Sequence, residues 1–304
     1  MPETMTEQRT AATYAHGALC GLAAVSIWAG NIIVGSLGLR SSLTAWDITA
    51  IRFAVAGLLL APLLARSGLA LDRLGWLGVA ALILGGAPTV LLANGGLLFA
   101  PAAHAGALFP GVMPLITAVL AALILKEAFT PRRHIGFAFI MSGAVLIAWG
   151  SGVTFGTAQT VGHLLFLGSA LAFACYTIAL RRARLDGLHA AAISAVGSML
   201  LYLPPYTVMA GLSMFNAPLG AIGLQALVQG LLTAVISYIV YGRAVSILGA
   251  SSGAAFAASC PAMTALMAIP ILGEWPTLTD WVAILSISLG VYVVSGGPMR
   301  RRHA

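Results

Sequence analysis

The sequence predicts an all-α polytopic membrane protein in which ten transmembrane helices form two inverted repeats of five helices. Hydrophobic residues make up 60% of the 304 residues and charged residues only 8%, whereas a soluble domain averages about 25% charged residues. The chain also divides into ten apolar stretches of roughly 17–25 residues, the length that crosses a bilayer as a helix. These observations exclude a soluble fold.

The expected spans follow one another with short connections. They are 15–37, 44–65, 75–98, 103–125, 133–150, 160–181, 189–211, 218–242, 249–272 and 280–297. Residues 1–14 are expected to form a cytoplasmic tail without a removable signal peptide, and 298–304 a second, basic cytoplasmic tail. The first repeat is expected to cover 15–150, and the second 160–297.

Cationic residues predict the orientation of these spans. Thirteen of the 15 Lys and Arg residues fall on one side if the first span crosses outward, whereas Arg40 falls on the other side and Arg52 lies within a span. Because cytoplasmic loops carry an excess of Lys and Arg, both termini are predicted to be cytoplasmic. The net charge of +7 then faces anionic lipid, and nucleic-acid binding is not expected.

An internal repeat supports the division into two halves. Residues 106–150 align with 253–297 without a gap, at a shift of 147 residues and with 14 identities in 45 positions. The pairs include Gly106/Gly253, Phe109/Phe256, Pro114/Pro261, Thr117/Thr264, Glu127/Glu274, Thr130/Thr277, Gly143/Gly290 and Gly150/Gly297. Since five spans is an odd number, the second copy must enter the membrane upside down. Inverted repeats place a binding site near the midplane between two mirror-related gates, so the pattern predicts a carrier.

Prolines interrupt three of the expected spans. Pro88 lies in the third span, Pro110 and Pro114 in the fourth, and Pro261 and Pro270 in the ninth. A proline removes a backbone donor and kinks a helix. Interrupted spans in matching positions of two halves indicate where a transport site lies.

Polar residues inside spans are expected to face a cavity or another helix, because an unpaired polar group in hydrocarbon is costly. Trp28 and Asn31 share one helix face and either line a cavity or join two helices. Phe173 and Tyr176 mark a similar face on the sixth span, where Tyr176 is expected to approach Trp28. The eighth span carries a polar residue at every fourth position, which favours a water-filled vestibule over helix–helix hydrogen bonding. Its members are Gln225, Gln229, Thr233, Ser237 and Tyr241.

Ionisable residues are scarce inside the spans. Arg52 is expected to bond to a backbone carbonyl in preference to a substrate carboxylate. Glu127 and Glu274 lie at span ends and are expected to position the adjoining loops, and His104 and His163 are expected to be solvated histidines at the outer interface. No acidic residue is expected near the midplane, which disfavours a proton antiporter driven by a buried Asp or Glu.

Enzyme and cofactor motifs do not fit the sequence. Residues 249–253 satisfy GxSxG, but they open a membrane helix and have no suitable Asp and His partners. HExxH, a P-loop and a metal-ligand cluster are all missing from the sequence. Cys20, Cys175 and Cys260 each lie inside an apolar run and are expected to be small core residues. No enzyme activity, metal or cofactor is predicted.

Several motifs resemble those of a known family. Residues 28–31, Trp-Ala-Gly-Asn, resemble the Trp-Gly-x-Asn signature of EamA-type carriers in the drug/metabolite transporter superfamily, and Arg52-Phe53 resembles that family's Arg-Phe pair. The run 94–114, followed by Lys126-Glu127, is similar to the family's block of the third and fourth helices. The run 241–261 with Glu274 repeats this block in the second half.

The resemblance covers nearly the whole chain and is closest to bacterial exporters of aromatic and other neutral amino acids. It implies a multi-pass protein of the bacterial inner membrane, a monomer or homodimer, with a central cavity lined by spans 1, 3, 4, 6, 8 and 9. The expected substrate-binding residues are Trp28, Asn31, Thr89, Asn94, Phe109, Phe173, Tyr176, Gln229, Ser237, Tyr241 and Phe256.

The expected lining favours export of neutral amino acids and related small metabolites by alternating access. Aromatic rings bury apolar side chains, while amides and hydroxyls can bind the carboxylate and ammonium of a zwitterion. A nucleotide sugar would need several cations, where only Arg52 is present, and a lipophilic drug cation would need a buried carboxylate. Transporters of both kinds share this architecture and stay as alternatives, and a structural or lipid-scrambling protein is a more distant one.

Overall fold

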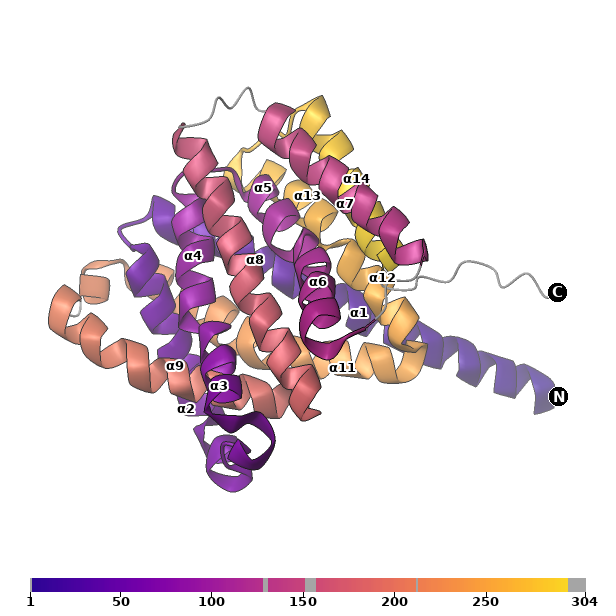
Figure 1. Ribbon diagram of the computed structural model, residues 1–304, viewed down its shortest axis with the longest axis horizontal. Helices are drawn as coiled ribbons and strands as arrows, with labels where there is room; N and C mark the ends of the chain where they lie inside the picture. Colours follow the sequence, from indigo (N-terminus) through magenta and orange to yellow (C-terminus); the bar gives the residue numbers. More distant parts are fainter. Residues whose placement is uncertain (1, 128–130, 151–156, 212, 295–304) are drawn as a thin grey trace.

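The computed structural model describes residues 2–127, 131–150, 157–211 and 213–294, which are almost entirely helical (Figure 1). Thr130 of the repeat pair Thr130/Thr277 and the basic tail 298–304 lie outside these residues. The elements are α1 (Pro2–Arg40), α2 (Ala45–Ser67), α3 (Leu71–Leu84), α4 (Ala87–Leu97), α5 (Ala102–Gly106), η1 (Ala107–Gly111), α6 (Met113–Leu125), α7 (Pro131–Gly150), α8 (Ala158–Ala183), α9 (Gly187–Ala210), η2 (Ser213–Asn216), α10 (Leu219–Gln225), η3 (Ala226–Ile236), α11 (Ser237–Leu248), α12 (Ala250–Ala258), α13 (Cys260–Leu272) and α14 (Leu278–Val294).

The number of spans agrees with the sequence. Within the described residues, seven helical segments are long and apolar enough to cross a membrane. They are Thr13–Arg40, Ala45–Ser67, Leu71–Leu97, Ala102–Leu125, Ala158–Ala183, Gly187–Ala210 and Leu219–Leu248. The shorter apolar helices Arg133–Trp149, Cys260–Leu272 and Leu278–Val294 occupy the places of the fifth, ninth and tenth spans. The predicted ten-helix fold class is confirmed.

Four spans are interrupted, and they are the third, fourth, eighth and ninth. α3 ends at Gly85-Gly86 before Pro88 opens α4, and α12 ends at Ser259 before Pro261 opens α13. The fourth span has a π-helical turn, η1, around Pro110, and the eighth has the longer π-helix η3. The proline-containing interruptions follow the sequence, but η3 contains no proline and was not predicted. π-helical segments inside α-helices are frequent at functional sites.

The third and eighth spans share one local hydrogen bond. Thr89 Oγ1 donates to the carbonyl oxygen of Leu84 at 3.0 Å, and Thr233 Oγ1 donates to that of Val228 at 2.7 Å. Each threonine reaches back five residues and satisfies a carbonyl at a break in the ordinary helical pattern. Both halves thus use a threonine to satisfy a carbonyl oxygen inside an interrupted span.

Helix packing has the symmetry of a duplicated unit. α7 packs along α14, and α2 packs along α9, so each pair joins corresponding spans of the two halves (Figure 1). α1 packs against α11 and α13, while α8 packs against α3, α4 and α6. Exchanging the two halves converts the first set of contacts into the second. With five spans in each half, this arrangement is the predicted pair of inverted repeats.

Glycines hold the two self-paired helices in close contact. A Cβ atom added at Gly143 of α7 would lie 2.6 Å from the carbonyl oxygen of Ala283 in α14. One added at Gly290 would lie equally close, at 2.6 Å, to the carbonyl oxygen of Gly136. Small residues let membrane helices approach to backbone contact, so the α7–α14 pair depends on these positions.

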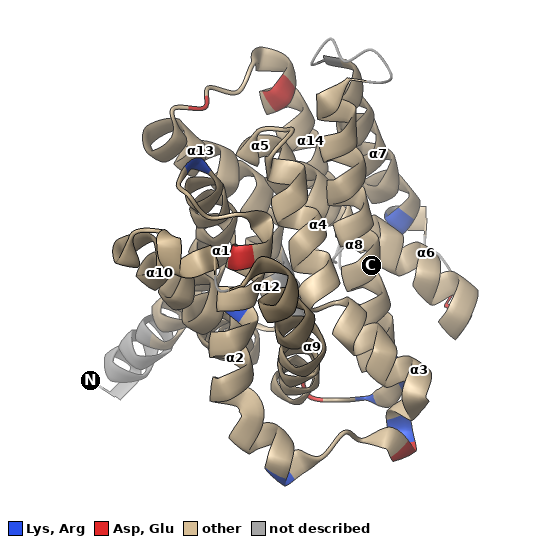
Figure 2. Ribbon diagram, turned by 90° about the vertical axis from the view of Figure 1, so that its left-hand side faces the viewer, with Lys and Arg blue, Asp and Glu red and all other residues tan. Residues whose placement is uncertain are grey.

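Charged residues are few and lie mainly near helix ends (Figure 2). We call one end of the bundle the basic end, because it carries most of the described cations. These are Arg66, Arg73, Lys126, Arg133, Arg181, Arg182, Arg184 and Arg243. The other end, called the opposite end, holds Arg40 with Asp47, Glu274 and Asp280. This separation is the charge asymmetry from which the orientation is predicted.

Candidate functional site

Arg52 of α2 lies between the two repeats and bonds to one amide side chain from each. Its Nη1 atom donates to Oδ1 of Asn31 on α1 and to Oε1 of Gln229 on η3, both at 3.1 Å. Its Nε atom is buried without a hydrogen-bond partner. None of the ion pairs in the described part of the chain involves Arg52. The guanidinium is therefore held by neutral groups and lacks a counter-ion.

A second amide from the first repeat joins this cluster over Gly35 of α1. A Cβ atom added at Gly35 would lie 2.8 Å from Oδ1 of Asn94 and 3.3 Å from Nε2 of Gln229. Glycine is the residue that permits this approach of both amides to the helix backbone. The Nδ2 atom of Asn94 is also buried without a partner. The centre of the bundle thus contains a cation and an unused amide donor.

The space beside Arg52 is small. A cavity of about 40 Å³ is bordered by Arg52, by the break at Gly85-Gly86 and by Phe173, Tyr176 and Tyr238. A cavity needs roughly 10–15 Å³ to hold one water molecule, so this one admits only a few. The described conformation is closed around the guanidinium.

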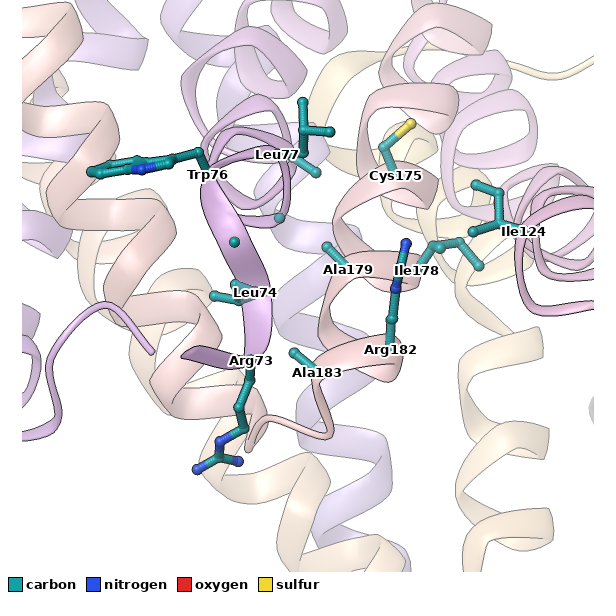
Figure 3. A pocket seen from close by; sticks show the side chains of 13 residues that line it. Arg73, Leu74, Trp76, Leu77, Ile124, Cys175, Ile178, Ala179, Arg182 and Ala183 are labelled. Carbon is teal, nitrogen blue, oxygen red and sulfur yellow. The ribbon is translucent and has the colours of Figure 1, made fainter. Parts of the chain in front are cut away.

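A much larger cavity of about 610 Å³ lies at the basic end, between α3, α8 and the end of α6. Figure 3 shows its apolar walls, with Arg182 beside Cys175 and Ile178 on α8 and with Arg73 on α3. The two cavities are bordered by successive stretches of the same helices, α3 and α8. A route between them would pass the buried ring of Tyr176.

The aromatic side chains expected in the site lie in two groups, one at α8 and one at α1. Phe173 lies edge-on to Phe109 at a centroid distance of 6.3 Å and stacks on Tyr176 at 5.0 Å. On α1, Trp28 packs against Tyr241 of α11 at 5.0 Å. The ring of Phe256 packs on α1 at Gly21, about two turns before Trp28. A Cβ atom added at Gly21 would meet this ring. Because α1 and α8 hold corresponding places, the two groups are related by the repeat.

At the opposite end, the carboxylate of Glu274 joins three segments of the chain. We call its contacts the clasp. Glu274, which follows α13, accepts a hydrogen bond from Arg40 at the end of α1. Its second oxygen accepts from the backbone N–H of Ala102 at 2.8 Å, which caps the start of α5. Arg40 also donates to the carbonyl oxygen of Leu272 at 2.7 Å. These contacts tie the first repeat to the second, so Glu274 positions a loop as predicted.

Two histidines and an aspartate form a buried cluster beside this clasp. Nδ1 of His104 on α5 lies 3.0 Å from Nε2 of His163 on α8, and its Nε2 lies 3.1 Å from Oδ1 of Asp280 on α14. The three residues are only 3%, 6% and 7% exposed. The prediction that His104 and His163 are solvated interface histidines is therefore wrong. Each ring finds a polar partner on a distant segment, which offsets the cost of burying it.

Family comparison agrees with this architecture. The model of the EamA-like transporter family matches residues 15–149 and again residues 160–296. The chain belongs to the EamA-like transporter family. As a member of this family it is a multi-pass membrane protein.

Two relatives of this EamA-like chain come from Bacillus subtilis (strain 168). The uncharacterized transporter YyaM is 26% identical over 201 residues, which cover 63% of this chain and 64% of the relative. The uncharacterized transporter YwfM is 26% identical over 199 residues, which cover 64% of each chain. The matched stretch thus spans less than two thirds of the length of either relative.

A solved crystal structure is similar in fold to this chain. The similarity covers 92% of this chain and 96% of the other chain, with a TM-score of 0.61 and 20% sequence identity. That likeness shows the fold.

The structure brings together some of the expected site residues of this EamA-like transporter. Asn31, Asn94 and Gln229 meet in the central cluster, whereas Thr89 and Ser237 bond to carbonyl oxygens of their own spans. The aromatic residues Trp28, Phe109, Phe173, Tyr176, Tyr241 and Phe256 fall into the two groups described above. Tyr176 stacks on Phe173, and the partner of Trp28 is Tyr241, so the expected approach of Tyr176 to Trp28 is not the contact observed.

The polar stripe of the eighth span is packed and does not line a vestibule in this conformation. Nε2 of Gln225 donates to the carbonyl oxygen of Val34 on α1 at 2.6 Å, and Oγ of Ser237 donates to that of Thr233 at 2.7 Å. Gln225, Gln229 and Ser237 are each 1% exposed. Helix–helix contacts and bonds within the span account for most of the stripe.

Arg52 has hydrogen-bond partners other than those the sequence predicts. Its observed partners are side-chain amides of α1 and η3, and not the backbone carbonyl that was expected. A cation in the middle of an otherwise apolar span is by itself a signal for a functional site. Its neighbours, which decide the matter, come from separate spans and cannot be identified by spacing.

Proposed function

We propose that this EamA-like transporter exports neutral amino acids, aromatic and aliphatic, and that Arg52 binds the substrate carboxylate. The observation that supports this proposal is the guanidinium of Arg52, which lies between the repeats with amide partners and no acidic one. A buried charge without a counter-ion is costly, by several kcal/mol even after relaxation. A substrate that supplies a negative charge would remove this cost while it is bound.

The chemistry of the surrounding groups fits the rest of an amino acid. A carboxylate accepts two parallel N–H bonds from a guanidinium, and it would replace the amide oxygens of Asn31 and Gln229. Those oxygens would then be free to accept hydrogen bonds from the substrate ammonium. The rings of Phe173 and Tyr176 border the same cavity and provide an apolar surface for the side chain. A zwitterion with an apolar side chain satisfies all three parts.

Alternating access follows from the symmetry of the two repeats. Repeats related by an inverted axis can rock against each other around a fixed site. The described conformation combines a fastened opposite end with a cavity of about 610 Å³ at the basic end. If the basic end is cytoplasmic, this is the side from which an exported solute arrives. We therefore place the transporter in the bacterial inner membrane with both termini cytoplasmic.

The proposed mechanism also bears on the limits of the two repeats and on the number of chains in the transporter. Residues 15–150 and 160–297 would be the two moving repeats, and the site between them is complete in one chain. A monomer suffices for the mechanism, and a homodimer is compatible with it.

Counterflow in proteoliposomes tests the function. Vesicles are preloaded with unlabelled phenylalanine, methionine or threonine and offered the labelled amino acid outside. We expect saturable accumulation that other neutral amino acids block. Phenylethylamine, which is phenylalanine without its carboxylate, should compete poorly. Competition by phenylethylamine equal to that of phenylalanine would contradict the role of Arg52.

The same vesicles test the alternative functions. A nucleotide sugar or a lipophilic cation that undergoes counterflow while amino acids do not would overturn the proposal. A lipophilic cation is disfavoured, because it would meet the positive charge of Arg52 without a nearby described carboxylate. Lipid scrambling without saturable solute exchange would point to the most distant alternative.

A further inference from the structure

The cluster of His104, His163 and Asp280 joins the two repeats at the opposite end. His104 belongs to the first repeat, whereas His163 and Asp280 belong to the second. Asp280 is fixed in place, because its Oδ2 atom accepts from the backbone N–H and the hydroxyl of Thr277, both at 2.8 Å. Separating the repeats at this end would pull His104 away from both partners.

Hydrogen-bond chemistry shows how many protons this cluster can hold. An ionised aspartate only accepts, so Nε2 of His104 must carry a hydrogen. With His104 neutral, its Nδ1 atom accepts from Nε2 of His163, and Gln159, whose Nε2 lies 3.3 Å away, can also donate to it. The cluster then has a net charge of −1.

One added proton keeps the bonds of His104 to His163 and to Asp280, whereas Gln159 must turn its NH2 group away from Nδ1. If His104 carries both ring hydrogens, its Nδ1 atom donates to Nε2 of His163, which is then the acceptor. The net charge of the cluster becomes zero, because His104 and Asp280 form a buried ion pair. A buried charge that gains a hydrogen-bonded counter-ion is much less costly than an unpaired one. In the closed cluster the added proton is thus held between groups of both repeats, and separating the repeats would break this ion pair.

Other charged groups near the cluster are already paired. Glu274 and Arg40 form an ion pair with each other beside the start of α5. Within the described residues, α4, η1, α6 and α12 carry no titratable side chain that faces the cluster. The titratable groups on the remaining neighbouring helices lie farther along toward the middle or the basic end: Tyr14, His16 and Cys20 on α1, Asp72 and Arg73 on α3, Arg133 and His134 on α7, Cys175, Tyr176, Arg181 and Arg182 on α8, Cys260 on α13 and Tyr292 on α14. The charge of the cluster thus depends on His104, His163 and Asp280.

We propose that His104, His163 and Asp280 form a proton-binding site that holds the opposite end closed when it is occupied. A proton binds more tightly to the closed state than to the open one, so by linkage protonation shifts the population toward closure. Deprotonation leaves Asp280 buried without a counter-ion and favours opening. This inference rests on the alternating access proposed above, and it adds the proton as a ligand of the carrier.

Solute exchange at different pH values tests this site. Counterflow of labelled phenylalanine is measured with the pH set equal on both sides of the vesicle membrane, at steps between about pH 8 and about pH 5, where histidine titrates. In the wild-type protein we expect the exchange rate to fall by about fivefold or more toward acid pH. His104→Gln should exchange at a rate that no longer depends on pH. His189→Gln, a histidine at the basic end that contacts the carbonyl oxygen of Gly68, should keep the wild-type response.

A second measurement does not require that the solute is known. Spin labels are attached through Phe99→Cys and Trp275→Cys, two exposed positions at the opposite end, in a chain whose three native cysteines are replaced. Distances between the labels in liposomes should show a longer, open population that decreases toward acid pH. His104→Gln or, if that variant does not fold, His163→Leu, which removes the acceptor for the added hydrogen of His104, should remove the change with pH.

The outcomes separate the two proposals. Phenylalanine exchange without any pH response, together with label distances that do not change with pH, would overturn the proton site and leave the proposed function intact. Label distances that respond to pH only when His104 and His163 are present would support the site even if amino acids are not exchanged. A pH response that persists in both histidine variants would also overturn it.

Discussion

The buried charged groups around Arg52 and around Asp280 differ in how completely their charges are satisfied. In the centre, Arg52 has two amide partners, an unpartnered Nε atom and no acid. At the opposite end, Asp280 has a histidine, a hydroxyl and a backbone N–H, and His104 bonds on both sides of its ring. Both clusters join elements of the two repeats.

This difference indicates different tasks. Membrane interiors rarely keep an unpaired cation, because its desolvation is not offset. An incomplete cluster is therefore a place for a partner that arrives and leaves, such as a substrate carboxylate. A complete cluster fastens the segments that contribute to it, and its strength changes when a proton is added or removed. Under the two proposals above, the centre would bind the substrate and the opposite end would hold the two repeats together.

The largest expected effect tests the incomplete cluster. Arg52→Gln should lower the apparent affinity for phenylalanine by about 100-fold, since a bidentate carboxylate bond contributes about 3 kcal/mol and 1.4 kcal/mol is a factor of ten. Its melting temperature should stay equal or rise, because a buried unpaired charge has been removed. Counterflow and thermal unfolding of the same preparation measure both. A large drop in melting temperature would show that Arg52 has a structural role.

Two glutamines one turn apart provide the next test. Gln229→Ala removes one partner of Arg52 and should weaken substrate binding by about tenfold, the effect of one hydrogen bond to a charged group. Gln225→Ala removes only the contact with the backbone of Val34. It should lower the stability by about 1–2 kcal/mol and leave the apparent affinity unchanged. Equal effects of the two variants on affinity would contradict the separation between site and packing.

A smaller effect is expected at the clasp of the opposite end. Glu274→Gln keeps the size of the side chain but removes its charge, so the bond with Arg40 and the cap at Ala102 both weaken. We expect the free energy of unfolding to fall by about 1–2 kcal/mol, in the range for partly buried ion pairs and helix caps. Glu127→Gln, at the corresponding place of the first repeat, is the matched control, since the side chain of Glu127 is 32% exposed, against 20% for Glu274. A control effect as large as that of Glu274→Gln would remove the special role of the clasp.

The features that could be predicted from the sequence are local ones. Span lengths, the interruptions at Pro88, Pro110 and Pro261, and the repeat of 106–150 in 253–297 depend on composition and order within one segment. Hydropathy and proline chemistry suffice for them. The π-helix η3 was not predicted because no proline marks it, although the row of polar residues along the same span did show that this helix is unusual.

Contacts between distant segments could not be predicted. Asn31 and Gln229 are 21 and 177 residues away from Arg52 in sequence. His104 is 59 residues from His163 and 176 from Asp280. An isolated histidine near a span end is equally compatible with a solvated interface and with a buried network. Only the packing of α5, α8 and α14 decides between them, and this packing assigns both histidines to the buried network.

The smallest expected effect concerns a residue that the sequence places in the site and that the structure satisfies elsewhere. Ser237 Oγ donates to the carbonyl oxygen of Thr233 within its own span, so a substrate gains nothing from it in this conformation. Ser237→Ala should change the apparent affinity by less than about twofold, as expected for a local bond that adds little net free energy. Thr233→Val, which removes the bond across the π-helix, is the comparison, because η3 should then lose its geometry and the position of Gln229. A loss of affinity for Ser237→Ala as large as that for Gln229→Ala would show that the serine faces the substrate in another conformation and that the incomplete cluster extends to the basic end.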